Sequence, residues 1–142
     1  MRILLAEGQL RARFALRVLL EQRKGLEVVG EVEDSRALLA QIQVLHPDLI
    51  LLVWGLPGMP TKELLKSLRQ IYPRLYIVVL GERQEWRRLA LAAGADAFVS
   101  KAYPPEELLA AIDLYRSSLN VEIGTSNEIS FYKRRKKNEI TS

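Results

Sequence analysis

The sequence predicts an α/β fold in which five parallel strands alternate with five helices. Two observations support this prediction. First, short β-branched and apolar runs alternate five times with stretches of helical periodicity, and the turns between them are short. Second, the run at 49–54 is apolar throughout, as expected of a strand buried on both faces of a parallel sheet. Parallel neighbours need right-handed helical crossovers, so we expect a five-stranded doubly wound parallel sheet with strand order 2-1-3-4-5.

The composition indicates one globular domain. Of its 142 residues, 49% are hydrophobic and 27% are charged, which supplies ample apolar material for a core. The chain has no Cys, which excludes disulfides and zinc–thiolate sites, and its single His excludes a histidine cluster. No apolar run approaches the roughly 20 residues that span a bilayer, so we expect a cytoplasmic protein. We also expect no bound metal and no cofactor.

The first βα unit begins with a strand at 3–6, which ends at the polar turn Glu7-Gly8. The helix that follows is expected to end at Lys24-Gly25, where a cation in the last turn precedes a glycine. Apolar residues at helical spacing should form its buried face, namely Leu10, Phe14, Val18 and Leu19. Charged residues should fill its other face, namely Arg11, Arg13, Arg17 and Glu21.

The second unit has a strand at 26–32 and a helix for which Asp34-Ser35 offers an N-cap. The helix should end at His46-Pro47, because the residue before a proline is pushed out of the helical region. We interpret His46 as a cap or surface residue rather than as a ligand or base. The apolar face of this helix comprises Leu38, Leu39, Ile42 and Leu45.

The third unit is the strand at 49–54, a Pro-Gly turn at 57–60 and a helix that Thr61 should cap. Tyr72-Pro73 ends this helix. Its expected buried stripe is Leu64, Leu65, Leu68 and Ile71.

The last two units have strands at 75–80 and 97–100, separated by a loop at 81–84 and a helix that Gly94 ends. Pro104-Pro105-Glu106-Glu107 is a strong start for the final helix. The residues that mark these two helices are Trp86, Leu89, Ala90 and Ala93 in the first, and Leu108, Leu109, Ile112 and Tyr115 in the second.

We expect residues 1–118 to form the domain and residues 119–142 to be a linker or basic tail. The tail carries a basic run, namely Lys133, Arg134, Arg135, Lys136 and Lys137. It is either a solvated linker that leads to an output domain outside this chain, or a contact for nucleic acid that gains affinity by counterion release. We favour the linker.

Short motifs occur in a fixed order around the strand at 49–54. They are Pro47-Asp48 before it, Pro57-Gly58-Met59 after it, then Tyr72-Pro73, the segment 93–98, Lys101 and Pro105-Glu106-Glu107-Leu108. Together they make residues 2–115 resemble the receiver domain of bacterial two-component response regulators. The resemblance implies the flavodoxin-like strand order given above.

The resemblance also implies where a phosphorylation pocket should lie. In such receivers an Asp ends the third strand and accepts a phosphoryl group, two acids after the first strand hold Mg²⁺, and a hydroxyl and a Lys contact the phosphoryl oxygens. Laid onto this sequence, the acceptor position is Val53, and the hydroxyl position is Gly81. The positions of the acid pair are Glu7 and Gly8, and only the first of them holds an acid. Lys101 matches unchanged, with Phe98 at the aromatic switch position.

Valine has no group to phosphorylate, so the resemblance implies an atypical pseudo-receiver that lacks the phosphoacceptor. Two interpretations of the remaining pocket are open. Glu7 and Lys101 form an ion pair above Val53, because a half-buried lysine needs a partner. Alternatively, the pocket binds a small ligand or anion that Lys101 anchors.

We expect a non-enzymatic, phosphorylation-independent signalling module, the regulatory N-terminal part of a transcription regulator. It should contact a protein partner or form a homodimer through the face of its fourth helix, fifth strand and fifth helix, which carries Trp86, Arg87, Arg88, Glu106, Glu107 and Tyr115. The alternatives are a stand-alone adaptor whose basic tail binds nucleic acid, and a small-ligand-binding domain. The turn Glu7-Gly8-Gln9 lacks the Gly- or Ser-rich composition that cradles phosphates, which argues against a flavin or nucleotide.

Overall fold

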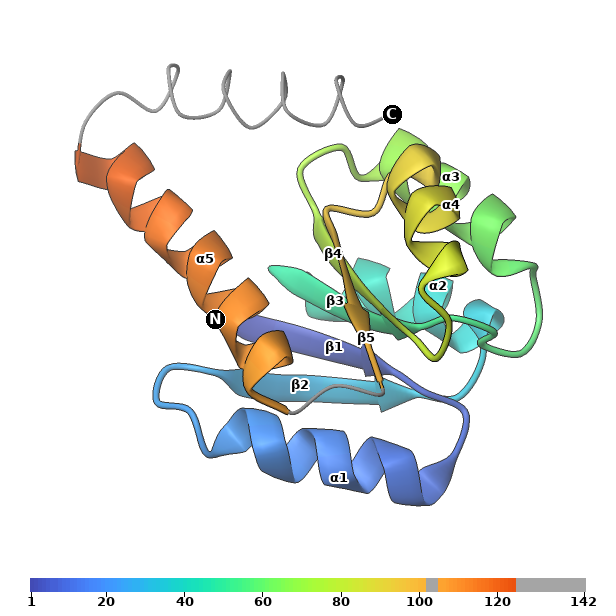
Figure 1. Ribbon diagram of the computed structural model, residues 1–142, viewed down its shortest axis with the longest axis horizontal. Coiled ribbons are helices and arrows are strands. Elements are labelled where there is room, and N and C mark those ends of the chain that lie inside the picture. Colours follow the sequence, from blue (N-terminus) through green and yellow to red (C-terminus); the bar gives the residue numbers. More distant parts are fainter. Residues whose placement is uncertain (102–104, 125–142) are drawn as a thin grey trace.

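A computed structural model describes residues 1–101 and 105–124 of the chain (Figure 1). In these residues a parallel sheet has the order β2-β1-β3-β4-β5, which confirms the predicted topology. The strands are β1 (Arg2–Ala6), β2 (Glu27–Val32), β3 (Leu49–Val53), β4 (Tyr76–Gly81) and β5 (Ala97–Ser100). The helices are α1 (Leu10–Glu21), α2 (Ser35–Leu45), α3 (Thr61–Ile71), α4 (Glu85–Ala93) and α5 (Pro105–Gly124). No helix of the described segments is long and apolar enough to cross a membrane.

Strand β3 lies at the centre of the sheet, between β1 and β4, and all of its residues are buried. Its side chains alternate between two cores. Ile50 and Leu52 point toward α2, α3 and α4, whereas Leu49, Leu51 and Val53 belong to the core beneath α1 and α5. Full burial of such a side chain contributes about 1.5–3 kcal/mol. The apolar residues of β3 therefore contribute to the cores on both faces of the sheet.

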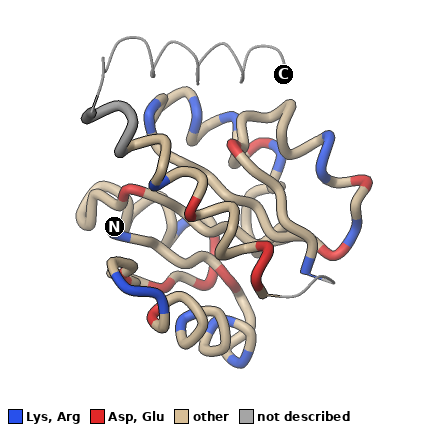
Figure 2. The backbone as a smooth tube through the Cα atoms, turned by 60° about the vertical axis from the view of Figure 1, so that its left-hand side comes forward, with Lys and Arg blue, Asp and Glu red and all other residues tan. Residues whose placement is uncertain are grey.

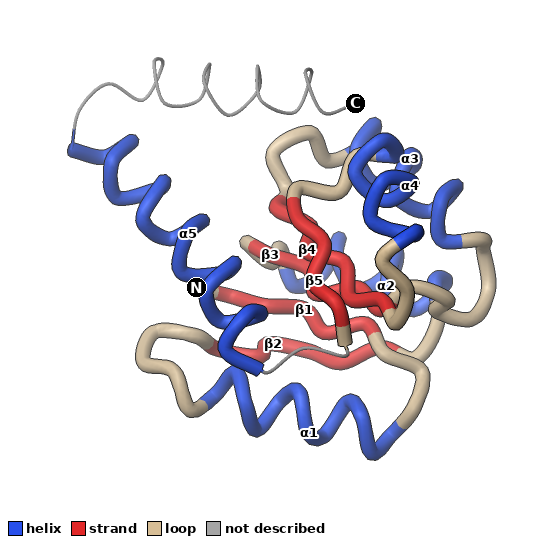
Figure 3. Tube along the Cα trace, in the orientation of Figure 1, coloured by secondary structure: helices blue, strands red, loops and turns tan. Residues whose placement is uncertain are grey.

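The sheet is covered by helices on both faces (Figures 1 and 3). Helices α1 and α5 cover one face, and α2, α3 and α4 cover the other. This is the layered arrangement expected of a doubly wound fold. The carboxyl ends of the strands all lie at one edge of the sheet, which is where the loops that follow β1, β3 and β4 lie.

Helix α1 does not bury the face that its apolar spacing predicted. Leu10 and Phe14 are 71% and 65% exposed, and Val18 is also exposed. The buried residues of the helix are Arg13 and Leu20. Leu16 and Leu19 are half-buried and pack against the same core as Leu20.

The burial of Arg13 explains this rotation. Its guanidinium forms ion pairs with Glu31 at 3.3 Å and Glu33 at 3.2 Å, and its Nη1 donates to the Glu7 carbonyl oxygen at 2.9 Å. Arginine tolerates burial when its planar fork of donors is satisfied in this way. Once Arg13 faces β2, the row that starts at Leu10 lies on the solvent side of the helix.

The helix ends confirm some expected caps and correct others. Asp34 accepts a hydrogen bond from the Ala37 N–H at 2.8 Å, which confirms the predicted cap of α2. Thr61 is not the cap of α3, because it is already helical and Pro60 holds the cap position. The Thr61 hydroxyl instead accepts from the Gly55 N–H at 2.8 Å, which braces the loop after β3.

Two further sequence expectations differ from the structure. Ile71 was expected in the buried stripe of α3 but is 60% exposed, because the helix ends there and the stripe stops at Leu68. Helix α5 continues to Gly124, well past Tyr115. Residues 125–142, which include the basic run at 133–137, lie outside the described residues. We retain as a proposal the division into a domain at 1–118 and a linker or tail at 119–142.

The orientation of α1 predicts contrasting effects of two substitutions. Leu20→Ala should lower the free energy of unfolding by about 2–4 kcal/mol, because it leaves a cavity in the core. Phe14→Ala should change it by less than about 0.5 kcal/mol, because an exposed side chain buries little area on folding. Urea denaturation followed by circular dichroism measures both values. A larger loss for Phe14→Ala than for Leu20→Ala would contradict this orientation.

Candidate functional site

The candidate site lies at the carboxyl edge of the sheet and is built around one ion pair. Lys101 Nζ lies 3.0 Å from Glu7 Oε1, and this confirms the pairing expected from the sequence. The Glu7 side chain is 5% exposed and the Lys101 side chain is 26% exposed. The pair therefore places a buried carboxylate against a cation that still reaches solvent.

Backbone hydrogen bonds fix the two partners on their strands. The Glu7 N–H donates to the Val32 carbonyl oxygen at 3.1 Å, which extends the pairing of β1 with β2. The Lys101 N–H donates to the Gly81 carbonyl oxygen at 2.8 Å, which extends the pairing of β5 with β4. Glu7 and Lys101 are thus held by the sheet itself rather than by loops, and their separation is set by strand geometry.

Val53 ends β3 beside this pair and is buried at 7% exposure. It belongs to the core beneath α1 and α5, together with Leu5, Leu80 and Val99. Its side chain offers no acid, base or nucleophile. The end of β3 therefore contributes packing and no reacting group to this edge.

Gly81 ends β4 where two aromatic rings approach its backbone. A Cβ atom on Gly81 would lie 2.7 Å from Phe98 Cζ and 3.1 Å from Trp86 Cε3. Phe98 is 5% exposed and lies in the core beneath α2, α3 and α4. The Phe98 ring therefore occupies space that a side chain at position 81 would need.

Gly8 lies under the loop that follows β3. A Cβ atom there would lie 3.1 Å from Pro57 Cδ and 3.4 Å from the Glu33 carbonyl oxygen. A side chain at position 8 would therefore be in tight contact with the Pro57 ring, which would have to shift by a few tenths of an ångström to accommodate it.

A stacked tryptophan pair that the sequence analysis did not identify packs against the core cluster that contains Phe98. The Trp54 and Trp86 ring centroids are 5.6 Å apart, and their planes differ by 16°. The Arg83 guanidinium lies 5.9 Å from the Trp86 ring centroid. Trp54 directly follows Val53 at the end of β3, and Trp86 is the second residue of α4. The sequence carried no signal for their stacking, because Trp86 is separated from the end of β4 at Gly81 by a loop.

The second missed feature is the network around Arg13. Glu31 also pairs with Arg17, whose guanidinium bonds Glu21 as well. The hydrogen bond to Glu21, and after it the hydrogen bond to Glu31, raises the pKa of the Arg17 guanidinium above its ordinary value. Acids at alternate positions of an extended segment share one side, so Glu31 and Glu33 were the signal for a facing cation.

The residues expected at an interaction face divide into exposed and buried ones. Arg87, Arg88, Glu106 and Glu107 are exposed, and Trp86 is half-buried. Tyr115 is only 6% exposed and stacks on Tyr76 with 3.9 Å between ring centroids, so it contributes to the core. Basic and acidic residues are interspersed over the described chain (Figure 2).

No group of three or more His, Cys, Asp or Glu side chains that could hold a metal ion occurs within residues 1–101 and 105–124. The basic run that the sequence analysis offers to nucleic acid, Lys133 to Lys137, lies outside those segments.

Comparison with known proteins gives concordant results. A family model described as "Response regulator receiver domain" matches residues 3–113. The nitrate/nitrite response regulator protein NarL of Escherichia coli strain K12 is 32% identical over 112 residues, which are 78% of this chain and 52% of NarL. The chain thus spans about half the length of this curated relative.

Solved structures are similar over most of the described chain. A two-component response regulator of the LuxR family from Aurantimonas sp. SI85-9A1 has a TM-score of 0.76 and 29% identity, covering 80% of this chain and 83% of that one. RcsB from Salmonella enterica serovar Typhimurium, bound to promoter rprA in the presence of phosphomimetic BeF3-, has a TM-score of 0.77 and 27% identity. That match covers 82% of this chain and 60% of RcsB.

The Glu7–Lys101 pair predicts a measurable coupling. Lys101→Met should lower the free energy of unfolding by about 2 kcal/mol at pH 7, because it leaves a buried carboxylate without its cation. This value allows for solvent screening of the partly exposed Lys101 side chain. Adding Glu7→Gln to Lys101→Met should recover part of that loss. Urea denaturation of the two single variants and the double variant gives the coupling energy. Simple additivity of the two single losses would contradict the pairing.

Proposed function

This chain belongs to the response regulator receiver domain family, and we propose that it signals without phosphorylation of an aspartate. The observation that supports the proposal is the buried valine at the end of β3, the position at which the family resemblance locates the phosphoacceptor. An apolar side chain accepts no phosphoryl group. The other losses at this edge, Gly8 and Gly81, act in the same direction.

The electrostatics of the edge also favour this proposal. Phosphoryl transfer on an aspartate needs a nucleophile and metal ions or cations that neutralise the transferred group. Mg²⁺ prefers an octahedral set of oxygen ligands that includes one or two carboxylates. Here Glu7 is a single buried carboxylate, and its Oε1 is already paired with Lys101. Lys101 thus neutralises the Glu7 carboxylate within the protein, without a metal ion or a phosphoryl group.

We propose further that the state of the domain is fixed by packing around Gly81. Phosphorylation shifts a two-state equilibrium only when the two states bind the group differently. Without a side chain at position 81, the Phe98 ring has space to lie inside the core, and Trp86, which stacks on Trp54, also approaches Gly81. The packing thus favours one position of the Phe98 ring. In this proposal the signal that the domain receives is contact with a protein partner rather than phosphorylation.

The output in this proposal is contact with another protein. Helices α4 and α5 flank the edge strand β5, and their exposed charges, Arg87, Arg88, Glu106 and Glu107, offer a polar surface for a partner or for a second copy. NarL and RcsB are response regulators, and RcsB has been seen on promoter DNA. We therefore propose that this chain is the regulatory N-terminal part of a transcription regulator, with 119–142 as its linker.

Phosphorylation independence predicts that beryllofluoride or acetyl phosphate with Mg²⁺ leaves the amide NMR spectrum of the chain unchanged. A variant that combines Gly8→Asp with Val53→Asp serves as the matched control, because it restores the acid pair and the acceptor. That variant should respond at amides near positions 8, 53 and 101. A saturable shift around residues 53 and 81 in the unaltered chain would refute the proposal.

The packing around Gly81 predicts that Gly81→Ala lowers the free energy of unfolding by about 1–3 kcal/mol, because its Cβ overlaps the Phe98 ring. Phe98→Leu removes ring atoms from that space, so Gly81→Ala should cost less in a Phe98→Leu background. Urea denaturation measures both effects, and tryptophan fluorescence reports the displacement of the Trp54–Trp86 pair. Equal costs in the two backgrounds would show that the ring does not fill the space.

A further inference from the structure

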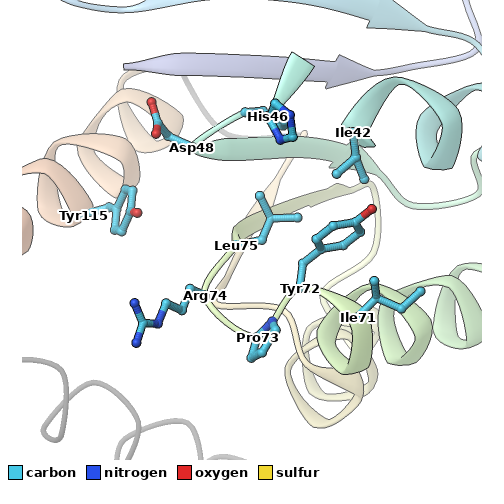
Figure 4. Close-up of a pocket in the computed structure, with 10 residues that line it drawn as sticks. Ile42, His46, Asp48, Ile71, Tyr72, Pro73, Arg74, Leu75 and Tyr115 are labelled. Atoms are coloured by element: carbon cyan, nitrogen blue, oxygen red, sulfur yellow. The ribbon is translucent and has the colours of Figure 1, made fainter. Parts of the chain in front are cut away.

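A pocket of about 530 Å³ lies at the amino ends of the strands, between α2, α3 and α5 (Figure 4). Its charged and phenolic groups already have partners within the protein. Asp48 accepts the Arg2 N–H at 2.7 Å, and Arg74 and Tyr115 also interact with other groups of the chain. These groups stabilise the rim of the pocket, and they do not define a ligand.

Helix α1 carries three large apolar side chains on its outer side. Leu10, Phe14 and Val18 are exposed and follow one another at intervals of four residues, so they form one continuous apolar ridge on the helix surface. No other helix or strand of the described chain covers this side of α1 (Figures 1 and 3). Single exposed apolar residues are common, whereas a contiguous group of them marks a contact surface. The apolar ridge is therefore available to a second molecule.

The surface beside the apolar ridge is shaped to receive a ridge of the same kind. The next row of α1 comprises Arg11, Ala15 and Leu19. Ala15 is exposed and small, so the groove between the two rows is deepest beside Phe14. Rows of residues at intervals of four pack into one another's grooves at a crossing angle of about −50°, the commonest class of helix packing. A large side chain next to a small one therefore makes this face complementary to itself.

The charges that border the apolar ridge are compatible with a second copy. On one side, Arg13 and Arg17 both form ion pairs with Glu31, so this border is neutralised within the chain. On the other side, Arg11 belongs to the row of Ala15. When the apolar ridge of each copy lies in the groove beside Ala15, the two Arg11 residues fall outside the paired ridges and on opposite sides. Two rows of apolar residues then separate these like charges, and salt screens the repulsion that remains.

We propose that α1 of one copy packs against α1 of a second copy of this chain, about a two-fold axis close to Phe14. The Phe14 ring of each copy lies in the groove beside Ala15 of the other. This contact is isologous, because both copies present the same patch, and it closes the assembly at a dimer. The proposal does not rest on phosphorylation independence, because no residue of the apolar ridge takes part in the Glu7–Lys101 pair. It also leaves the charges of α4 and α5 accessible to a protein partner.

The size of the apolar ridge sets the strength of this dimer. A phenylalanine side chain presents about 150–250 Å² when fully exposed, so the three side chains expose roughly 300 Å² per copy. Two copies therefore bury roughly 600 Å² of ridge surface, which is below the roughly 1,200 Å² at which stable complexes begin. We expect a transient dimer with a dissociation constant on the order of 0.1 mM. At low micromolar concentrations, where circular dichroism is measured, the chain is then monomeric.

The concentration dependence of the full chain tests the proposal. Sedimentation equilibrium from about 5 µM to about 1 mM should show the mass rising from that of a monomer toward that of a dimer. Over the same range, amide NMR shifts should change at residues 10–19. A chain that stays monomeric throughout would overturn the proposal, and so would concentration-dependent shifts centred on α4 and α5 instead of α1.

Two variants and a matched control assign the contact. Phe14→Ser removes the ring, and Ala15→Gln fills the groove without adding charge, so each should weaken the self-association about tenfold or more. Both positions are exposed in the monomer, so neither substitution disturbs the core. Leu114→Ser removes a comparably exposed leucine from α5 and should leave the association unchanged.

Two outcomes contradict the assignment to α1. Unchanged association in both Phe14→Ser and Ala15→Gln, or its loss in Leu114→Ser alone, would show that the contact lies elsewhere. Amide shifts at residues 125–142 in dilute Phe14→Ser would show that the chain's own C-terminal segment, rather than a second copy, covers the apolar ridge.

Discussion

The structure depends on one constraint, the burial of β3 on both of its faces. Leu49 to Val53 alternate between two cores, and each core is closed by a different set of helices. A residue at the end of this strand lies next to Glu7 and Lys101 and is also part of the packing beneath α1 and α5. An ionised group at position 53 would need compensation from its neighbours, because an isolated buried charge is costly. Valine removes that need and joins the core.

An ion pair and an aromatic ring occupy the neighbouring strand ends. Glu7 and Lys101 neutralise each other, and the Phe98 ring fills the space above Gly81. The edge is held by strand hydrogen bonds, and Trp54, the residue after β3, stacks on Trp86. These contacts support our proposal that the receiver scaffold is retained while the phosphorylation chemistry is absent.

Several parts of the fold could be predicted because they depend on local chemistry. The Asp34 cap, the left-handed Gly94 that ends α4 and the acidic first turn of α5 follow from interactions within a few residues. The Glu7–Lys101 pair was also predictable, since parallel strands bring their carboxyl ends to one edge and a buried lysine needs a partner. The Trp54–Trp86 stack was not, because ring geometry depends on loops whose paths the sequence does not specify.

The sequence by itself determined the number of βα units and the apolar character of the central strand, because hydrophobic period and connection length decide these features. The strand order 2-1-3-4-5 was an expectation for doubly wound sheets in general, and the structure confirms it. The tertiary structure alone decided which side of α1 faces the sheet. The row Leu10, Phe14 and Val18 has the spacing of a buried face, yet it is exposed. Arg13 takes its place because Glu31 and Glu33 approach it across the α1–β2 contact. The Arg13 ion pairs depend on how α1 packs against β2, which only the folded chain specifies, and here they outweigh the local apolar pattern.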